Sequence, residues 1–296
     1  MTRSALDAAA LRWASRPTSA AGIGARVVTA GEDLLLVAVS EEERHVSVAR
    51  LVGEWPPEVE PLASHPVGGL GAILDEVIAS PDRVVACSAS GQAVVMHGGT
   101  WSRFRGAALA FERGTGGLYS ARVEGTGTCV VEHRAAPASG AAPRELGRFQ
   151  AHGERVFGCA LEDGGYLIGS AAPGERVRLY RADARARFEP VRADVIAVGD
   201  RHLLVTRRGG AWWVSGTTSF TRDAKPIRLV IHTLDGDALD TIGAFELRER
   251  EERPCAACVI GDDLAIATSG LDYSVVVTMV CARSASRHPS GETIAT

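Results

Sequence analysis

Two cysteines near the C-terminal end of the chain have a spacing that suits metal or redox chemistry. Cys255 and Cys258 form a Cys-x-x-Cys pair, and Cys281 and His288 could supply the other two ligands of a zinc site. Side chains three residues apart on a strand point to opposite faces, so one metal could hold both thiolates only at a bulge or turn. Pro254 leaves room for such a turn. The alternative, which we favour, is that both cysteines are structural residues of a strand and that the protein binds no metal or other cofactor.

Other catalytic patterns are missing from the sequence. None of the eight histidines forms a His-x-His or His-x-x-x-His pair. The segment from Cys87 to Gly91 lacks the first glycine of a Gly-x-Ser-x-Gly nucleophile elbow. The glycine-rich turn from Gly114 to Gly117 is not followed by the Gly-Lys-Ser/Thr of a phosphate-binding loop. These patterns argue against a serine hydrolase and against a phosphate-loop enzyme.

Arginine and tryptophan, the residue types enriched in binding hot spots, occur together at one place. Arg207 and Arg208 lie just before Trp212 and Trp213. Neighbouring residues of a strand point to opposite faces, so we expect one of the two indoles to face outward. This segment is our first candidate surface for binding a partner protein.

A second candidate surface is acidic. Glu41, Glu42 and Glu43 form an expected hairpin loop, and a run of alternating charges covers residues 246–253. Charged loops of this kind dock partners in some proteins and are merely solvated in others. Both interpretations stay open.

The charge and composition exclude several classes of function. With 32 basic and 36 acidic residues, the net charge is −4, which provides no general attraction to nucleic acid or to an anionic membrane. Asparagine does not occur, so N-glycosylation is impossible, and lysine occurs only at Lys225. This bias is typical of a GC-rich bacterial genome.

The sequence also predicts where the protein resides. No apolar run approaches the ~18 residues that would span a bilayer. Arg3, Asp7, Arg12 and Arg16 interrupt any signal-peptide core. Six cysteines in a chain of 296 residues do not resemble a disulfide scaffold, and several lie in apolar runs as reduced thiols would. We therefore expect a cytoplasmic protein.

The elements that must position these residues form an internal repeat. A short apolar run, a turn with Gly or Asp, a second apolar run and a third alternating run recur six times, and the second runs start at 34, 84, 118, 166, 203 and 264. Such runs, rich in Val, Ile and Tyr and bounded by turn residues, predict strands. Units of three or four strands every ~40–50 residues predict an all-β protein with the β-propeller fold.

The repeats resemble those of the WD40 and NHL class of propeller proteins. The resemblance covers nearly the whole chain as a pattern only, because no Trp-Asp pair ends a third strand and no Gly-His pair opens a repeat. We expect one propeller domain over residues 1–296, with six blades and seven as the alternative. In the fifth unit we assign residues 195–198, 203–206 and 211–215 to the first three strands. The N-terminal segment 1–22 is either a short helix, since Ser4 and Asp7 suit a capping box, or the strand that closes the ring.

The expected function follows from the fold and from what the motifs exclude. Six-bladed lactonase-like enzymes hold a divalent metal with acidic and asparagine ligands, and a chain without asparagine cannot assemble that set. We therefore expect a non-catalytic scaffold that binds a partner protein within a larger bacterial assembly. A hydrolase or lyase with its site in the central channel, and a sensor of a small ligand or peptide, remain the alternatives.

Overall fold

The computed structural model describes most of the chain between Leu6 and Ala282. The described residues are 6–7, 13–15, 26–30, 33–40, 45–53, 58–66, 74–88, 91–97, 100–125, 127–135, 142–152, 155–183, 185, 187–199, 201–216, 228–235, 238–246, 253–260, 263–269 and 275–282. They form 25 strands. Among them, no helix is long and apolar enough to cross a membrane.

Three of the sheets are four-stranded antiparallel meanders. The first contains β3 (Arg26–Ala30), β4 (Asp33–Ser40), β5 (His45–Val52) and β6 (Glu58–Pro66). The second contains β7 (Leu74–Ser80), β8 (Arg83–Ser88), β9 (Gln92–His97) and β10 (Thr100–Arg105). The third contains β11 (Ala107–Phe111), β12 (Leu118–Glu124), β13 (Thr128–Arg134) and β14 (Arg144–Gln150).

Two further four-stranded units are joined into one eight-stranded sheet. One unit is β15 (Val156–Ala160), β16 (Tyr166–Ser170), β17 (Arg178–Ala182) and β18 (Phe188–Ala193). The other is β19 (Arg201–Arg207), β20 (Gly210–Gly216), β21 (Arg228–Asp235) and β22 (Ala238–Glu246). The outermost strands β18 and β22 run parallel and pair at Arg192 with Ala238 and at Ala193 with Leu239.

The last sheet combines the two ends of the chain. It contains β23 (Arg253–Ile260), β24 (Asp263–Ser269) and β25 (Val275–Ala282). Two short N-terminal strands, β1 (Leu6–Asp7) and β2 (Trp13–Ser15), pair antiparallel with β25. The described part of the N-terminal segment therefore takes the place of the outer strand that the last repeat lacks.

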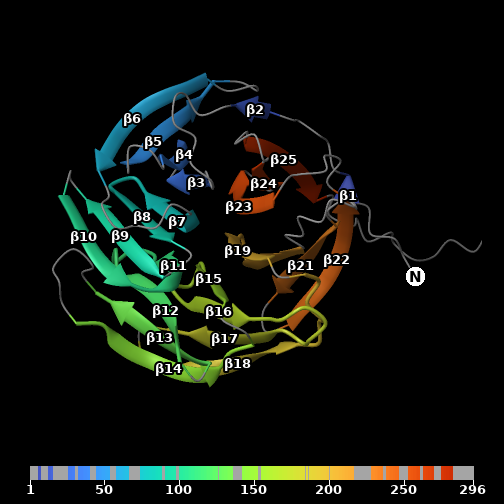
Figure 1. Ribbon diagram of the computed structural model, residues 1–296. Helices are drawn as coiled ribbons and strands as arrows, with labels where there is room; N and C mark the ends of the chain where they lie inside the picture. Colours follow the sequence, from blue (N-terminus) through green and yellow to red (C-terminus); the bar gives the residue numbers. More distant parts are fainter. Residues whose placement is uncertain are drawn as a thin grey trace, which may run out of the picture.

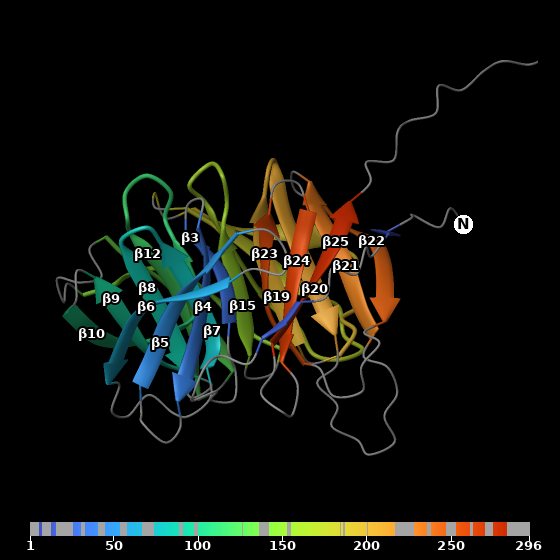
Figure 2. The same cartoon turned by 90° about the horizontal axis from the view of Figure 1, so that it is seen from above.

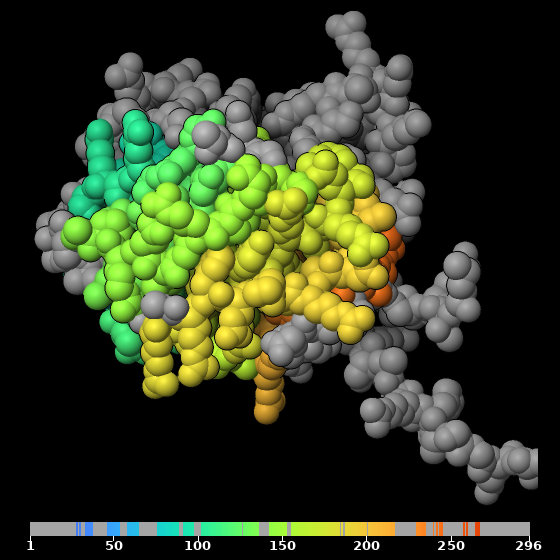
Figure 3. All heavy atoms as spheres, turned by 90° about the horizontal axis from the view of Figure 1, so that it is seen from below, coloured from blue at the N-terminus to red at the C-terminus, as the bar shows by residue number. Residues whose placement is uncertain are grey.

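The sheets stand around a common axis, as Figure 1 shows. The innermost strands β3, β7, β11, β15, β19 and β23 contact one another in this order, and β23 contacts β3 to close the ring. Figure 2 shows the same ring from the side, with the sheets next to one another. In Figure 3 the outer strands of the middle units form a continuous surface coloured from green to yellow. The predicted all-β propeller is confirmed.

The predicted number of blades requires a correction. We expected six blades with seven as the alternative, and the structure has five separate hydrogen-bonded sheets. The reason is the edge pairing of β18 with β22, which merges two four-stranded units into one double blade. That pairing joins Arg192 to Ala238, which are 46 residues apart, so no pattern within either strand predicts it.

The strand assignment of the fifth unit was also wrong by one strand. We took residues 195–198 as its inner strand, but the inner strand is β19 and residues 195–198 form only a single bridge, between Ile196 and Arg176. The second strand is therefore β20, which begins at Gly210 rather than at residue 203. With this correction, the second strands of the fifth and last units begin at Gly210 and Asp263, closer together than the predicted starts at 203 and 264.

The core lies between neighbouring sheets, so the central strands are buried on both faces. Tyr119 of β12 and Tyr166 of β16 stack across one such interface, with ring centroids 5.0 Å apart and planes at 1°. Within the sheet of β15–β18, the side chains on the two strands that flank Gly169 lie so close that a Cβ there would be 2.5 Å from Leu179 Cδ2 and 2.7 Å from Phe157 Cε2. This close approach explains the small residues in the middle strands.

Candidate binding site

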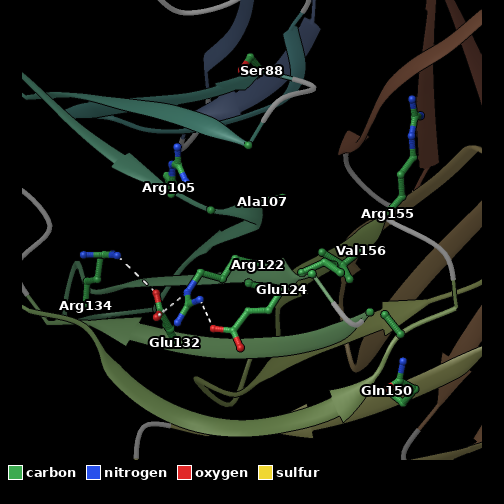
Figure 4. A pocket seen from close by; sticks show the side chains of 17 residues that line it. Ser88, Arg105, Ala107, Arg122, Glu124, Glu132, Arg134, Gln150, Arg155 and Val156 are labelled. Carbon is green, nitrogen blue, oxygen red and sulfur yellow. Dashed lines mark hydrogen bonds and ion pairs between the residues drawn. The ribbon is translucent and has the colours of Figure 1, made fainter.

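A cleft opens between the sheet of β7–β10 and the sheet of β11–β14 at one end of the ring. Figure 4 shows the first sheet above the cleft and the second below it. Its volume is about 1210 Å3. The lining residues are small or charged: Ser88, Gly91, Arg105, Gly106, Ala107, Ala121, Arg122, Val123, Glu124, Gly125, Gly127, Glu132, Arg134, Gln150, Ala151, Arg155 and Val156.

The strand order explains why these residues meet. Arg105 ends β10 and Ala107 begins β11, while Glu124 ends β12 and Gln150 ends β14. In antiparallel meanders, the end of one strand lies beside the start of the next, so all these positions lie at the same end of the ring. The apolar contacts between the two sheets, such as that of Leu118 with Val95, lie elsewhere in the same interface. Glu132 and Arg134 lie further along β13, where Arg134 pairs with Leu118, so the cleft extends from this end of the ring along β13.

Glycine turns shape the rim of the cleft. Gly127 closes the turn between β12 and β13, where its φ is +79° and its N–H donates to the Glu124 carbonyl at 2.7 Å. A positive φ of this size suits glycine because it has no Cβ. Gly91 has a φ of +74°, and neither Gly91 nor Gly125 would place a Cβ within 4 Å of another heavy atom. A ligand can therefore approach the backbone closely at both positions.

One wall of the cleft carries a ladder of alternating charges. Glu132 of β13 accepts from Arg122 Nε at 3.1 Å and from Arg134 Nη2 at 3.4 Å. Arg122 also forms an ion pair with Glu124, and the second oxygen of Glu124 accepts from Arg148 Nη1 at 3.2 Å. Dashed lines mark the contacts among the first four of these residues in Figure 4. The order along the ladder is Arg134, Glu132, Arg122, Glu124 and Arg148, so every neighbour of a charge has the opposite sign.

These contacts hold Arg122 and Arg134 in fixed positions. The hydrogen bond to Glu124, and after it the one to Glu132, raise the pKa of Arg122 against the opposing effect of burial. The Arg134 guanidinium also lies over the Phe104 ring, 5.1 Å from its centroid. Glu132 is only 7% exposed, so its carboxylate is largely removed from water and depends on the two arginines.

Arg105 and Arg155 differ from the arginines of the ladder. Both are exposed, and neither forms an ion pair with any residue that the structure describes. They come from different segments, the end of β10 and the link between β14 and β15. Within the described part of the chain, no ion pair occupies either guanidinium group.

The cleft lining has little that could perform covalent or acid–base catalysis. Its described lining residues include no histidine, cysteine, aspartate or tyrosine. Its serine, Ser88, donates its hydroxyl to the Gln92 carbonyl at 3.2 Å, and its two glutamates are both engaged in the ladder. Among the described lining residues no base lies beside a nucleophile, and the arginines offer hydrogen-bond donors to an anion.

The tryptophans of the predicted Arg–Trp surface are both buried. Trp212 is 4% exposed and Trp213 is 0% exposed. They do point to opposite faces of β20, but each face is covered: Trp212 packs with Leu264 of the last sheet, and Trp213 packs with Phe157 of β15. Our expectation that one indole faces outward was wrong, because a middle strand of a propeller has a sheet on either side.

The arginines of that surface have different surroundings. Arg208 is exposed at the turn between β19 and β20, and Arg207 is partly buried, which lowers its pKa by desolvation. Whether either residue binds a partner stays a prediction.

The remaining candidate sites are not covered in full by the structure. Glu41, Glu42, Glu43 and His288 lie outside the described residues. Cys255, Cys258 and Cys281 have described backbones in β23 and β25 but undescribed side chains. The register of β23 shifts between Pro254 and Ala256, which is the irregularity that a shared metal would require. Among the described residues, no group of three or more His, Cys, Asp or Glu side chains could hold a metal ion.

Sequence reasoning missed the cleft arginines altogether. Arg105, Arg122, Arg134 and Arg155 are isolated in the sequence and have no motif around them. In the register of β12 and β13, Arg122 lies opposite Val130 and Glu132 lies opposite Ser120, so Arg122 and Glu132 meet as diagonal neighbours. The order of the charges in the sequence does not predict that contact.

Comparison with known proteins supports the fold and goes no further. No family model and no curated protein matches the sequence. Among solved structures, the chain is similar to a Trypanosoma rangeli sialidase in complex with 2,3-difluorosialic acid, with a TM-score of 0.55, 11% identity, and coverage of 88% of this chain and 54% of that chain. The same sialidase with the inhibitor DANA matches with a TM-score of 0.55, 12% identity, and coverage of 88% and 55%.

A weaker similarity links the chain to TolB from Acinetobacter baumannii, with a TM-score of 0.47, 13% identity, and coverage of 87% of this chain and 63% of that chain. The chain spans about half the length of the sialidase chains it matches. At identities this low, the similarity to the sialidase shows a shared β-propeller fold alone.

Proposed function

We propose that the protein is a non-catalytic β-propeller that binds a partner protein at the end of the ring that holds the arginine-lined cleft. The observation that carries the proposal is the cleft itself, which is wide, charged and open, and lacks a nucleophile with an adjacent base. Arginine is one of the residue types that most often dominates binding energy at protein interfaces.

The size of the cleft favours a macromolecular ligand over a compact small molecule. Its volume of about 1210 Å3 exceeds the roughly 300–1,000 Å3 of typical small-molecule pockets. Such pockets are also mostly apolar, whereas this one is lined by four arginines, two glutamates and several glycines. A chain segment from a partner would fill the space, where it would contact the backbone at the rim glycines and the side chains of the charge ladder.

A hydrolase or lyase is less well supported by the described residues. Both carboxylates of the cleft already accept from arginines, and Glu132 is buried between two of them. Buried His133 and His232 are also engaged, with Glu112 at 3.0 Å and with Thr241 at 3.0 Å. A sensor of a peptide remains compatible with the same cleft, because a peptide and a partner segment have the same chemistry.

The proposal can be tested by site-specific photo-crosslinking in the cells that produce the protein. A photoreactive phenylalanine analogue at position 125 would project from the cleft rim into open space. Arg185 is a suitable control position, because it lies in the turn between β17 and β18 at the opposite end of the ring. We expect one protein to be crosslinked reproducibly from position 125 and not from position 185.

Catalytic turnover without a crosslinked partner would contradict the proposal. If purified protein turns over a substrate in a screen of hydrolase and lyase substrates, and position 125 crosslinks no protein, then the channel or cleft is a catalytic site. Crosslinking to one protein from both positions equally would indicate a docking surface that is not the cleft.

A further inference from the structure

We infer that the cleft recognises an acidic segment of the partner, whose carboxylates bind Arg105 and Arg155. The inference rests on the proposed function and adds to it the chemistry of the ligand. It starts from the contrast between the local and the overall charge. The described lining residues of the cleft have a formal charge of +2 from four arginines and two glutamates, whereas the whole chain has a net charge of −4.

The four arginines divide into two pairs with different tasks. Arg122 and Arg134 are neutralised by Glu124 and Glu132 and held by ion pairs and by the Phe104 ring. The excess positive charge therefore resides on Arg105 and Arg155, which lack an ion-pair partner among the described residues. A guanidinium presents donors in a fixed fork that matches a carboxylate, so each can hold one acidic side chain in a bidentate contact.

The positions of these two arginines favour a ligand with at least two separated charges. Figure 4 shows Arg105 at the end of the sheet of β7–β10 and Arg155 well apart from it, on the link that leads into β15. The two arginines therefore belong to different chain segments that line the same cleft. An extended segment with two or more Asp or Glu residues would span that space, whereas one small anion would occupy one arginine.

Nucleic acid fits the cleft less well than an acidic peptide does. Its phosphates would meet the same arginines, but proteins that bind single strands also stack aromatic side chains on the bases. None of the described residues that line the cleft is aromatic. The overall net charge of −4 would also repel a long polyanion beyond the cleft.

The ladder leaves Arg105 and Arg155 as the more attractive positions for a carboxylate. Glu124 and Glu132 line the same cleft and offset the charges of Arg122 and Arg134, so the ladder attracts a carboxylate less than Arg105 or Arg155 does. Acidic segments whose charges are spaced to reach those two arginines are therefore favoured.

A fluorescence-anisotropy titration with defined probes tests the inference on the full-length protein. The probes are a labelled octaglutamate peptide, a Gly-Ser peptide of equal length and an oligo(dT) of the same formal charge. We expect the protein to bind octaglutamate, to bind it less well as NaCl is raised from 50 to 500 mM, and to ignore the Gly-Ser peptide.

Matched variants show where the peptide binds. Arg105→Gln and Arg155→Gln are each expected to weaken octaglutamate binding by about fivefold to tenfold, the loss of one charge-assisted contact. Arg185→Gln changes the net charge equally at the opposite end of the ring and is expected to leave the affinity unchanged. Both cleft side chains are exposed, so the variants should fold, and their thermal unfolding curves verify this.

Several results would overturn the inference. No binding of octaglutamate would do so, as would equal weakening by Arg105→Gln, Arg155→Gln and Arg185→Gln. Tighter binding of oligo(dT) than of octaglutamate, sensitive to the same two arginines, would replace the acidic peptide by nucleic acid. The photo-crosslinking from position 125 tests the proposed function independently of these titrations. A protein crosslinked there, together with no binding of octaglutamate, would contradict this inference and leave the proposed function in place.

Discussion

Trp213 and His232 face each other across β20 and β21 and stack in the core, with ring centroids 4.3 Å apart and planes at 24°. Phe157 of β15 stacks on the same indole, with centroids 5.8 Å apart and planes at 7°. His232 is 0% exposed, and its ring nitrogens lie 3.0 Å from Thr241 Oγ1 and 3.3 Å from Ser215 Oγ. A titratable group that does not reach the surface is thus placed between an aromatic ring and two hydroxyls.

This arrangement predicts a pH-dependent stability. Burial lowers the pKa of His232 from 6.5 to about 4, because the charged imidazolium loses its hydration. The folded-state pKa is below the unfolded-state value, so the stabilisation is complete above pH 6.5 and is lost as the pH falls through 4. Integrated over that range, the loss is on the order of 3 kcal/mol in the free energy of unfolding.

Urea unfolding at several pH values from 7.5 to 4.5 measures this loss, with His232→Gln as the comparison. The variant lacks the titrating group, so its free energy of unfolding should fall less steeply below pH 6.5 than that of the wild type. Parallel pH profiles for the two proteins would show that His232 does not keep its lowered pKa.

The double burial of Trp212 and Trp213 predicts that both indoles are essential to the fold. Trp212→Ala and Trp213→Ala should each lower the free energy of unfolding by about 3–5 kcal/mol, because each leaves a large cavity between two sheets. Chemical denaturation with Arg208→Ala as the exposed control measures the effect. A variant at position 212 as stable as the control would place that indole at the surface.

The charge ladder predicts that Glu132 is needed for stability. Glu132→Gln removes the carboxylate that Arg122 and Arg134 share in a largely buried position, so we expect a loss of about 1–3 kcal/mol in the free energy of unfolding. The matched control is Glu189→Gln, because Glu189 is exposed on β18. Equal denaturation midpoints for the two variants would contradict the role assigned to Glu132.

Two buried thiols are predicted to be unreactive in the folded protein. Burial raises the pKa of Cys129 and of Cys159 to about 12, so almost no thiolate exists at pH 8. Iodoacetamide labelling followed by peptide mass spectrometry should leave both residues unmodified in the folded state and modify both in 6 M guanidinium chloride. Rapid labelling of either in the folded state would mean that its sheet interface opens.

The sequence alone was sufficient for the strands and for the fold class. Alternating or continuous apolar runs and turns such as Pro81-Asp82 are local features, and they predicted strands that the structure confirms, for example β8 and β9. The fifth unit failed because residues 195–198 are as apolar as an inner strand. Only the pairing of β19 with β20 shows which segment faces the axis.

Tertiary structure decided the features on which function depends. Whether Trp212 reaches solvent depends on the sheet of β24, which covers its face of β20. The cleft requires Arg105, Arg122, Arg134 and Arg155 to converge from four separate segments, and the blade number depends on the edge pairing of β18 with β22. The physical reason is common to all three: strand formation follows from neighbours in sequence, whereas burial, charge convergence and edge pairing follow from neighbours in space.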